Sequence, residues 1–363
     1  MTTPNKAQLD EAFRACEFGD PLVAISLYKR ILDQFPNHLG AGIGLTRAYF
    51  YAEQWLAAWN ALEVRFRLMP SPPNATRTGA DGALVPFPRW AGGPVPPRLL
   101  VLDEQGLGDT IQFSRFIPGL VAAGCRVILV THPRLLRLLK SIVEGVELRA
   151  NNVPGRVHGI DAWCPLLSIP GALGLTPKRF TPKMPYLVAE PDRVARWRHL
   201  AGGGKPTVGV CWQGNPNAPV DKGRSATLAA LAPLAAVDGV HLVSLQVGGA
   251  NAEIAGSAFA TRITIPGPDF DTGPDAFLDT AALIMSLDLV VTVDTAIAHL
   301  AGALGRPVWI GLRTPEPDWR WLRRETDTPW YPTARLFRQR KPGDWWEVFC
   351  RMADRLRTHG VGV

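Results

Sequence analysis

The sequence has few cysteines and no long hydrophobic run. No apolar stretch approaches the ~18–20 residues that a membrane-spanning helix needs. The five cysteines are scattered along the chain without a closely spaced pair, which argues against a disulfide framework and against a structural zinc site. The first 20 residues lack the basic stretch followed by an apolar one that a secretory signal has. We therefore expect a cytoplasmic chain with no transmembrane segment.

A complete glycine fingerprint for a dinucleotide is also missing. Residues 104–110 (EQGLGDT) carry two glycines but not the third glycine of GxGxxG, and they do not form a P-loop. An oxidoreductase is therefore not expected. The net charge of +7 comes largely from basic residues near the C-terminus. They are interleaved with Trp and Pro and contain no recognisable nucleic-acid-binding module. This balance favours phosphate-bearing small molecules over nucleic acid as partners.

The length and the overall composition of the sequence are those of a folded chain with several domains. Its 363 residues correspond to about two or three domains at the usual ~100–200 residues each. Hydrophobic residues make up 47 % of the chain and charged residues 20 %, so sizeable cores can form.

Residues 1–70 repeat a helical pattern with an offset of 34 residues. The matched positions are Ala24 and Ala58, Tyr28 and Leu62, and Pro36 and Pro70. Small residues let paired helices approach, an aromatic residue fills the space between them, and a proline ends the second helix. We interpret the segment as two tetratricopeptide-like hairpins; an unrelated four-helix segment is the alternative. Because about three repeats are usually needed for stability, we expect these two to dock on the next domain or to follow further repeats.

A Pro/Gly-rich linker at residues 71–97 separates this segment from two sets of alternating strands and helices. The expected strands are residues 98–103, 126–131, 146–149, 207–212, 241–246, 289–293 and 308–312. The expected helices are residues 110–123, 133–142, 276–287 and 295–304. The polar stretch 176–206 lies between the two sets. This pattern predicts an α/β fold with two doubly wound domains, residues 98–195 and 196–344, facing each other across a cleft.

The first candidate site follows the first expected strand. Gly106 and Gly108 permit a tight turn and close backbone approach, and Asp109 stands at the head of a helix. Asp109 could cap this helix and do no more. The functional interpretation is a carboxylate base in the crevice above the strand ends, where α/β sheets bind ligands.

The second candidate site follows the first strand of the second α/β domain. The loop contains Trp212 and Asn215, and it continues to Lys222 and Arg224. These two cations could contact a phosphate. Basic surface loops are common, so this segment alone is only weak support for a phosphate-binding site.

The third candidate site lies where the strand at residues 289–293 delivers Asp294 and Thr295 to a helix of small residues. Free amides at residues 295–297 and the helix dipole suit a pyrophosphate. Asp294 as an N-cap would occupy those amides, and it fits better as an acceptor of sugar hydroxyls. His299 lies one turn further along on the same face. A packed core histidine is the alternative there.

Together these segments resemble the bacterial tetratricopeptide-repeat glycosyltransferases, a group related to the lipopolysaccharide heptosyltransferases. The resemblance covers about residues 98–357. The segments that carry it are residues 98–118, 210–216, 221–225, 279–309, 318–322 and 329–345. It implies a GT-B fold of two Rossmann-like domains, with the donor site in the second domain. It also implies that a C-terminal helix, in residues 345–363, crosses back to the first domain.

The resemblance also assigns roles to residues. Asp109 is similar to the family's catalytic aspartate, and Asp294 with Thr295 is similar to its Asp-Thr pair at the donor. Arg224 or Lys222 stands near the family's donor-contacting lysine, although the loop departs from the family pattern there. The predicted donor-binding residues are Gly106, Gly108, Trp212, Asn215, Lys222, Arg224, Asp294, Thr295, Ala296 and His299.

The expected function is an inverting, metal-independent transfer of a sugar from a nucleotide-diphospho-sugar to a hydroxyl of a protein or a cell-envelope glycan. No cofactor beyond this co-substrate is expected. Asp269-Phe270-Asp271 resembles a metal-binding DxD motif, but we interpret it as a loop between Gly and Pro residues. The hairpins could recruit a protein or peptide. Two alternatives remain: an inactive tetratricopeptide scaffold with a GT-B-like half, and a GT-B nucleotide-sugar epimerase.

Overall fold

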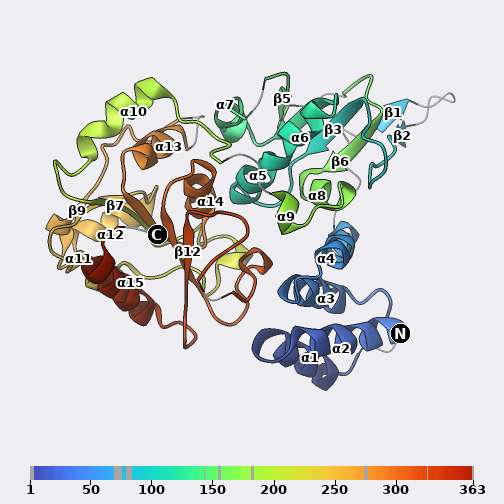
Figure 1. Ribbon diagram of the computed structural model, residues 1–363, viewed down its shortest axis with the longest axis horizontal. Coiled ribbons are helices and arrows are strands. Elements are labelled where there is room, and N and C mark those ends of the chain that lie inside the picture. Colours follow the sequence, from blue (N-terminus) through green and yellow to red (C-terminus); the bar gives the residue numbers. More distant parts are fainter. Residues whose placement is uncertain are drawn as a thin grey trace.

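The computed structural model describes residues 4–68, 76–78, 84–142, 144–153, 157–180, 184–273, 277–324 and 326–361. A helical segment comes first, followed by an N-terminal and a C-terminal α/β domain. The helical segment lies at the lower right of Figure 1, where it approaches both domains.

The helical segment consists of two successive hairpins. Its helices are α1 (Lys6–Phe18), α2 (Pro21–Gln34), α3 (Leu39–Tyr51) and α4 (Trp55–Leu62). The small residues at the matched repeat positions, Ala24 and Ala58, are fully buried. Tyr28 covers Gly44 so closely that a Cβ atom there would lie 2.3 Å from the tyrosine ring. The predicted packing positions are therefore confirmed. The tetratricopeptide assignment stays a prediction, and Pro70 lies outside the described residues.

The N-terminal domain is built on a parallel four-stranded sheet in the order β5-β4-β3-β6. Its strands are β3 (Arg98–Leu102), β4 (Arg126–Thr131), β5 (Glu147–Ala150) and β6 (Ala162–Pro165). The helices of this half are α5 (Leu107–Phe113), α6 (Ile117–Ala122), α7 (Leu136–Leu139), α8 (Ile169–Ala172) and α9 (Pro177–Phe180). The central three residues of β3 are fully buried, as expected for a strand covered on both faces.

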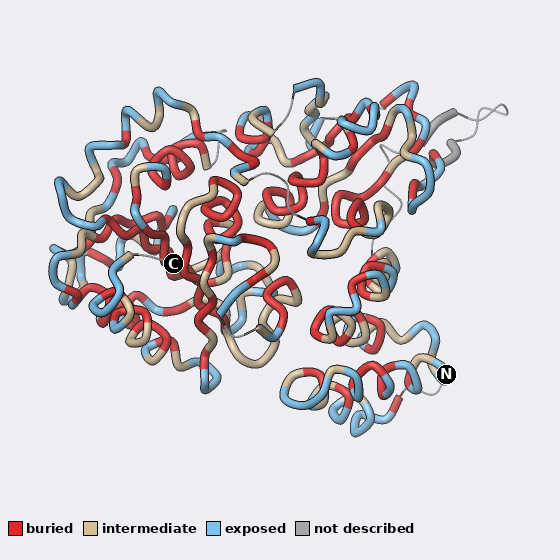
Figure 2. The backbone as a smooth tube through the Cα atoms, viewed as in Figure 1, coloured by how far each residue is buried: buried red, intermediate tan, exposed pale blue. Residues whose placement is uncertain are grey.

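The C-terminal domain is built on a parallel six-stranded sheet in the order β12-β11-β10-β7-β8-β9. Its strands are β7 (Thr207–Cys211), β8 (His241–Ser244), β9 (Ile263–Thr264), β10 (Leu289–Val293), β11 (Val308–Leu312) and β12 (Ala334–Arg338). Its helices are α10 (Pro191–Trp197), α11 (Ala232–Ala235), α12 (Ala252–Ala255), α13 (Leu278–Met285), α14 (Ala296–Ala303) and α15 (Trp345–His359). Figure 2 shows the central strands as buried backbone.

The predicted strands at residues 126–131, 289–293 and 308–312 are confirmed, whereas some other elements differ. The helix expected over residues 110–123 begins earlier and is divided by a 3-10 turn at Ser114–Phe116. Strands β6, β9 and β12 were not expected from the sequence. They are short or lie at sheet edges, where the apolar run is weak.

One predicted domain boundary and the predicted packing of the C-terminal helix are wrong. The boundary at 195/196 cuts α10, and α10 packs on α13 because Arg193 and Trp197 both donate to the Asp279 carboxylate at 2.7 Å. The terminal helix α15 does not cross back to the N-terminal domain. Its buried side chains belong to the core under the C-terminal sheet, with Val348 and Met352 fully buried there.

The part of the linker that the structure describes is attached to the N-terminal domain. Strands β1 (Thr76–Thr78) and β2 (Leu84–Pro86) form an antiparallel pair. Residues 88–90 then run beside Trp163 of β6, with backbone hydrogen bonds of 2.8 and 3.0 Å. This stretch is therefore a strap along the sheet edge.

The three parts of the chain share an aromatic core. Trp55 of α4 meets Phe180 of the N-terminal domain edge-on at 5.0 Å, and Phe180 stacks on Trp330 of the C-terminal domain at 4.7 Å. The expected docking of the hairpins is therefore confirmed, and it involves both α/β domains. Among the helices of the described part, none is long and apolar enough to span a bilayer.

Candidate active site

Both sheets reverse their strand order at the strand that begins the domain. In the N-terminal sheet β3 has β4 on one side and β6 on the other, and in the C-terminal sheet β7 has β8 on one side and β10 on the other. Ligands of doubly wound domains bind at the carboxyl ends of the strands at such a reversal. The loops after β3, β7 and β10 hold the predicted site residues, so the topology places all three candidate segments at switch points.

Asp109 lies in the first turn of α5, and its carboxylate is held from both domains. Its Oδ2 accepts the Gly106 N–H at 2.8 Å, so the aspartate does cap its helix as the alternative interpretation expected. Its Oδ1 accepts from Arg320 of the C-terminal domain. The side chain remains 19 % exposed. Burial raises the pKa of Asp109, and the positive charge of Arg320 opposes this effect.

Arg320 is the cation at the centre of this contact. Its guanidinium is 3 % exposed, and it donates to both carboxylate oxygens of Asp318 at 2.9 Å and to Gln112 Oε1 at 2.7 Å. Burial lowers the pKa of Arg320, but the Asp109 and Asp318 carboxylates raise it by more. Arg320 therefore remains charged and joins α5 of one domain to the loop after β11 of the other.

Asp294 adds a third carboxylate at the end of β10. Burial raises its pKa to about 7, with the Asp318 carboxylate adding to the effect and Trp321, Arg224 and Arg320 opposing it. Asp294 does not cap α14. Thr295 is the capping residue, since its side chain accepts the Ile297 N–H at 3.3 Å. The Asp294 carboxylate therefore does not occupy the amides at the start of α14.

The predicted cleft is closed by direct contact at α5 and α14. A Cβ atom on Gly108 would lie 3.1 Å from the Ala296 Cα and 3.0 Å from the His299 ring. Gly108 is therefore a packing residue that brings the two helix starts together, and Ala296 faces it. A diphosphate on the amides of α14 requires α5 and α14 to separate.

His299 is a packed core residue in this structure, and its predicted donor contact stays a prediction. Its ring stacks on Trp321 at 5.4 Å, and its Nδ1 is 3.0 Å from the Tyr331 hydroxyl. Burial, with a contribution from Arg320, lowers the pKa of His299 to about 3. The imidazole is therefore neutral, and it supports the interface between the domains.

The loop after β7 holds one buried and one exposed candidate. Trp212 is 1 % exposed and lies in the core of the C-terminal domain, so its side chain is not available to a donor in this structure. An aromatic residue directly after a buried strand continues into the core. Asn215 is exposed, and its Oδ1 accepts the Asn217 N–H at 3.1 Å in a local turn.

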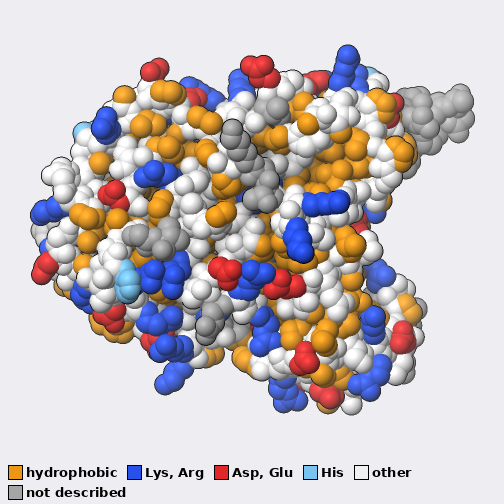
Figure 3. Space-filling model, viewed as in Figure 1, with side chains coloured by type: hydrophobic (Ala, Val, Ile, Leu, Met, Phe, Trp, Pro, Cys, Tyr) orange, Lys and Arg blue, Asp and Glu red, His pale blue; other side chains and the backbone are white. Residues whose placement is uncertain are grey.

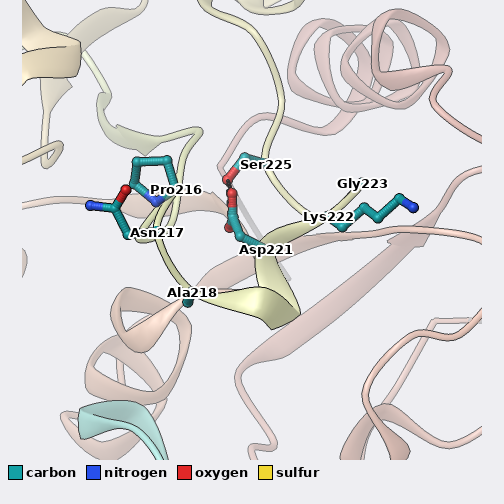
Figure 4. A pocket seen from close by; sticks show the side chains of 7 residues that line it. All are labelled: Pro216, Asn217, Ala218, Asp221, Lys222, Gly223 and Ser225. Carbon is teal, nitrogen blue, oxygen red and sulfur yellow. Dashed lines mark hydrogen bonds between the residues drawn. The ribbon is translucent and has the colours of Figure 1, made fainter.

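Arg224 and Lys222 differ in their availability. Arg224 donates to Asp221 Oδ1 through Nε at 3.1 Å and through Nη2 at 3.0 Å, and Gly214 leaves the space for this pair. Lys222 is exposed. Both belong to a loop that surrounds a cavity of about 470 Å³ lined by Asp221, Lys222 and Ser225. In Figure 4 Asp221 points toward Ser225, whereas the Lys222 side chain extends away from it.

The DxD-like motif serves the fold. Asp269 pairs with Arg196 of α10. Asp271 accepts the Asp279 N–H at 2.9 Å and the Thr280 hydroxyl, and so caps the start of α13. The predicted loop interpretation is confirmed. Across the described ranges, no group of three or more His, Cys, Asp or Glu residues is placed to hold a metal ion.

Sequence reasoning missed Asp318 and Arg320 as site residues. They follow β11 in an irregular loop, and Arg320 is separated from Asp109 by 211 positions. The available signal was their place at the carboxyl end of a parallel strand beside β10. Charged residues at that edge are candidates for a ligand site even without a glycine motif.

This arrangement defines the structural class of the protein, which has two facing doubly wound domains with titratable groups between them. Its fold matches that of the glycosyl transferase family 9 protein from Veillonella parvula, with a TM-score of 0.50, 12 % identity, and coverage of 68 % of this chain and 88 % of that one. ADP-heptose lps heptosyltransferase II of E. coli aligns at a TM-score of 0.45 and 15 % identity, over 72 % of this chain and 100 % of that one. The sheet topology and the match to the Veillonella parvula protein show that the fold is α/β and GT-B-like.

The sequence comparisons find one family match and one relative. Residues 272–341 match the family described as glycosyltransferase family 9 (heptosyltransferase). Protein FlbA of Caulobacter vibrioides is 30 % identical over 320 residues, which cover 82 % of this chain. The aligned region is 52 % of FlbA, so the chain spans about half the length of this relative. Residues 272–341 of the C-terminal domain are therefore similar to the family 9 glycosyltransferases, in agreement with the sequence resemblance.

Proposed function

We propose that the protein transfers a sugar, with inversion, from a nucleotide-diphospho-sugar to an acceptor hydroxyl. One observation carries the proposal. Asp109 of the N-terminal domain meets Arg320 of the C-terminal domain at the carboxyl ends of both sheets. A carboxylate in that position, with a pKa raised by burial, is suited to accept a proton from a substrate hydroxyl.

The proposed reaction is a single nucleophilic displacement at the anomeric carbon of the donor sugar. The acceptor oxygen attacks the anomeric carbon while its proton passes to the Asp109 carboxylate. The new carbon–oxygen bond forms as the bond from the anomeric carbon to the diphosphate oxygen breaks. The electron pair of that bond leaves with the nucleoside diphosphate. Attack opposite the leaving group inverts the anomeric centre.

The departing diphosphate needs positive charge and N–H donors. The amides at the start of α14 provide donors when the α5–α14 contact opens, and Lys222 and Arg224 lie on the neighbouring loop after β7. We propose Lys222 as the more accessible cation, since Arg224 is bound by Asp221. A reaction that relies on these groups needs no metal ion, and we expect activity to persist in excess EDTA.

Screening nucleotide sugars tests the donor class directly. A donor present at about 100 times its Kd should stabilise the folded chain by about 2.7 kcal/mol, and thermal unfolding reports this as a raised Tm. Product analysis then separates the alternatives. Release of nucleoside diphosphate with sugar appearing on an acceptor supports transfer, conversion of the donor sugar alone indicates an epimerase, and binding of no nucleotide sugar indicates an inactive scaffold.

Donor affinity should weaken as the pH rises through about 7. Asp294, with its pKa of about 7, is neutral below this pH and negatively charged above it, where it repels the diphosphate. A change of one pKa unit on binding corresponds to about a tenfold change in affinity. We expect Kd to rise roughly tenfold between pH 6 and pH 8, and Asp294→Asn to remove this dependence.

The matched control for this measurement is Asp238→Asn, whose carboxylate is fully exposed and precedes β8 at the opposite edge of the sheet. It should keep the wild-type profile. Isothermal calorimetry with an intact nucleotide sugar provides the affinities. A profile that Asp294→Asn leaves unchanged would remove Asp294 from the donor site.

The acceptor class is also a proposal. The helical segment could present a protein or peptide surface to the reaction, and a cell-envelope glycan is the other acceptor that the family resemblance suggests. A cytoplasmic location stays a prediction of the sequence. Deletion of residues 1–70 does not separate these cases, because the aromatic core of the chain includes Phe50, Trp55 and Trp59.

A further inference from the structure

The loop at residues 313–324, after β11, carries Asp318 and Arg320 and has an unusual backbone. Glu316 has φ +60° and Leu322 has φ +52°. Residues other than glycine rarely adopt such backbone angles. The angles persist where the surrounding structure holds the backbone in place. The helical segment supplies the contacts that hold this loop.

A charged bracket from the helical segment holds Glu316. Arg47 of α3 lies 2.7 Å from the Glu316 carboxylate and 3.2 Å from the Glu17 carboxylate of α1. Glu17 in turn accepts the Glu316 N–H at 2.9 Å, and its side chain is only 3 % exposed. Figure 3 shows basic and acidic side chains side by side where the helical segment meets the C-terminal domain.

An aromatic contact continues from the bracket to Arg320. Phe50 of α3 is fully buried and stacks on Trp319, with 4.0 Å between ring centroids and 17° between planes. The guanidinium of Arg320, the next residue, lies 4.5 Å from the Trp319 ring. The backbone of the same loop is also held by the Tyr51 hydroxyl, which donates to the Pro317 carbonyl at 3.3 Å.

We propose that the helical segment, through Arg47 and Phe50, positions Arg320 and thereby sets the place of the Asp109 carboxylate. This inference rests on the proposed function, since it makes Arg47 and Phe50 positioning residues for the proposed base. The helical segment is then a working part of the transferase unit in addition to any recruiting role. Displacements of about 1 Å at a reacting group can cost about 10²-fold in rate, so a loosened loop has a large effect.

The test compares Arg47→Gln, Glu316→Gln and the double variant in the full chain. We expect each single variant to lower kcat about tenfold or more, with a change in donor KM of less than threefold. The double variant should be no worse than either single one, because both break the same bracket. Arg30→Gln, on the exposed side of α2, is the control and should retain the wild-type rate.

A pH profile separates positioning from general destabilisation. The charged groups near Asp109 are Arg320, Asp318 and Glu104, and His299 of α14 is neutral. Withdrawal of Arg320 removes the positive charge that lowers the pKa of Asp109, so the acidic limb of kcat should move to higher pH in Arg47→Gln. A variant that is only less stable would keep the limb in place.

Hydrogen exchange provides a readout that needs no activity. Amides at residues 316–322 and 106–109 should exchange faster in Arg47→Gln and Glu316→Gln than in Arg30→Gln. If the wild-type chain transfers no sugar, the proposed function fails, while this exchange pattern alone still supports the coupling. Unchanged exchange, or faster exchange with an unchanged kcat in an active enzyme, overturns the inference.

Discussion

Asp109→Asn should lower turnover by about 10²–10⁴-fold, the usual contribution of general-base catalysis, while donor affinity stays close to that of the wild type. The amide retains the shape of the carboxylate and can still accept the Gly106 N–H, but it cannot take up a proton. The loss should therefore appear in kcat. Rates of nucleoside diphosphate release, measured with the donor that the screen identifies, provide the comparison.

Asp103→Asn is the matched control for this prediction. Asp103 follows the same strand, but its carboxylate accepts from Thr131 at 3.0 Å and from the His132 N–H at 2.8 Å within the N-terminal sheet. Its replacement should leave turnover within about twofold. Wild-type turnover in Asp109→Asn would remove Asp109 from the role of base, whatever the family resemblance implies.

The dependence of wild-type activity on pH follows from the same carboxylate, that of Asp109. The base must be deprotonated, and burial raises the pKa of Asp109. Activity should therefore fall as the pH drops through this raised pKa, at a higher pH than for an ordinary aspartate.

Arg65→Met should destabilise the chain by about 3–5 kcal/mol, which is the cost of leaving a buried charge without its partner. Arg65 donates to the two Glu104 oxygens at 2.7 and 2.8 Å and to the Ser168 hydroxyl at 2.7 Å. The Glu104 side chain is 1 % exposed. Without Arg65 this carboxylate loses its counter-ion at the junction between the helical segment and the N-terminal domain. Tm should fall by an amount on the order of 10 °C.

Two further variants show whether the buried charge is the cause. Arg65→Met with Glu104→Gln should recover most of the lost stability, because no unpaired charge remains. Arg357→Met breaks an exposed pair with Asp354 and should change the free energy of unfolding by less than about 1 kcal/mol. A double variant as unstable as Arg65→Met alone would contradict the explanation.

Much of the candidate site was predictable because motifs follow strands. The apolar runs at residues 98–103 and 289–293 fold as parallel strands, and loops after such strands meet at one edge of a sheet. The resemblance then connected Asp109 with Asp294. The confirmed parts of the prediction are thus those that depend on local pattern and on the order of elements.

The errors concern which surface a residue contacts. The pattern of α15 indicates one buried face, but an amphipathic helix can bury that face against any core of suitable shape, and here the core is the C-terminal sheet. Trp212 and His299 stand beside motif residues in the chain, and their side chains are buried in packed interiors. Neighbouring positions on a strand end or a helix differ in direction, and the motif does not specify which direction faces a ligand.

The sequence alone determined the α/β class, the order of the three parts and the strand ends that carry the carboxylates, because each of these follows from short-range periodicity. Only the tertiary structure decided that Arg320 meets Asp109, that Gly108 lets α5 and α14 touch, and that Arg47 and Phe50 hold the loop after β11. Such contacts join residues hundreds of positions apart. They depend on the shape and charge of whole packed surfaces, which no local pattern encodes.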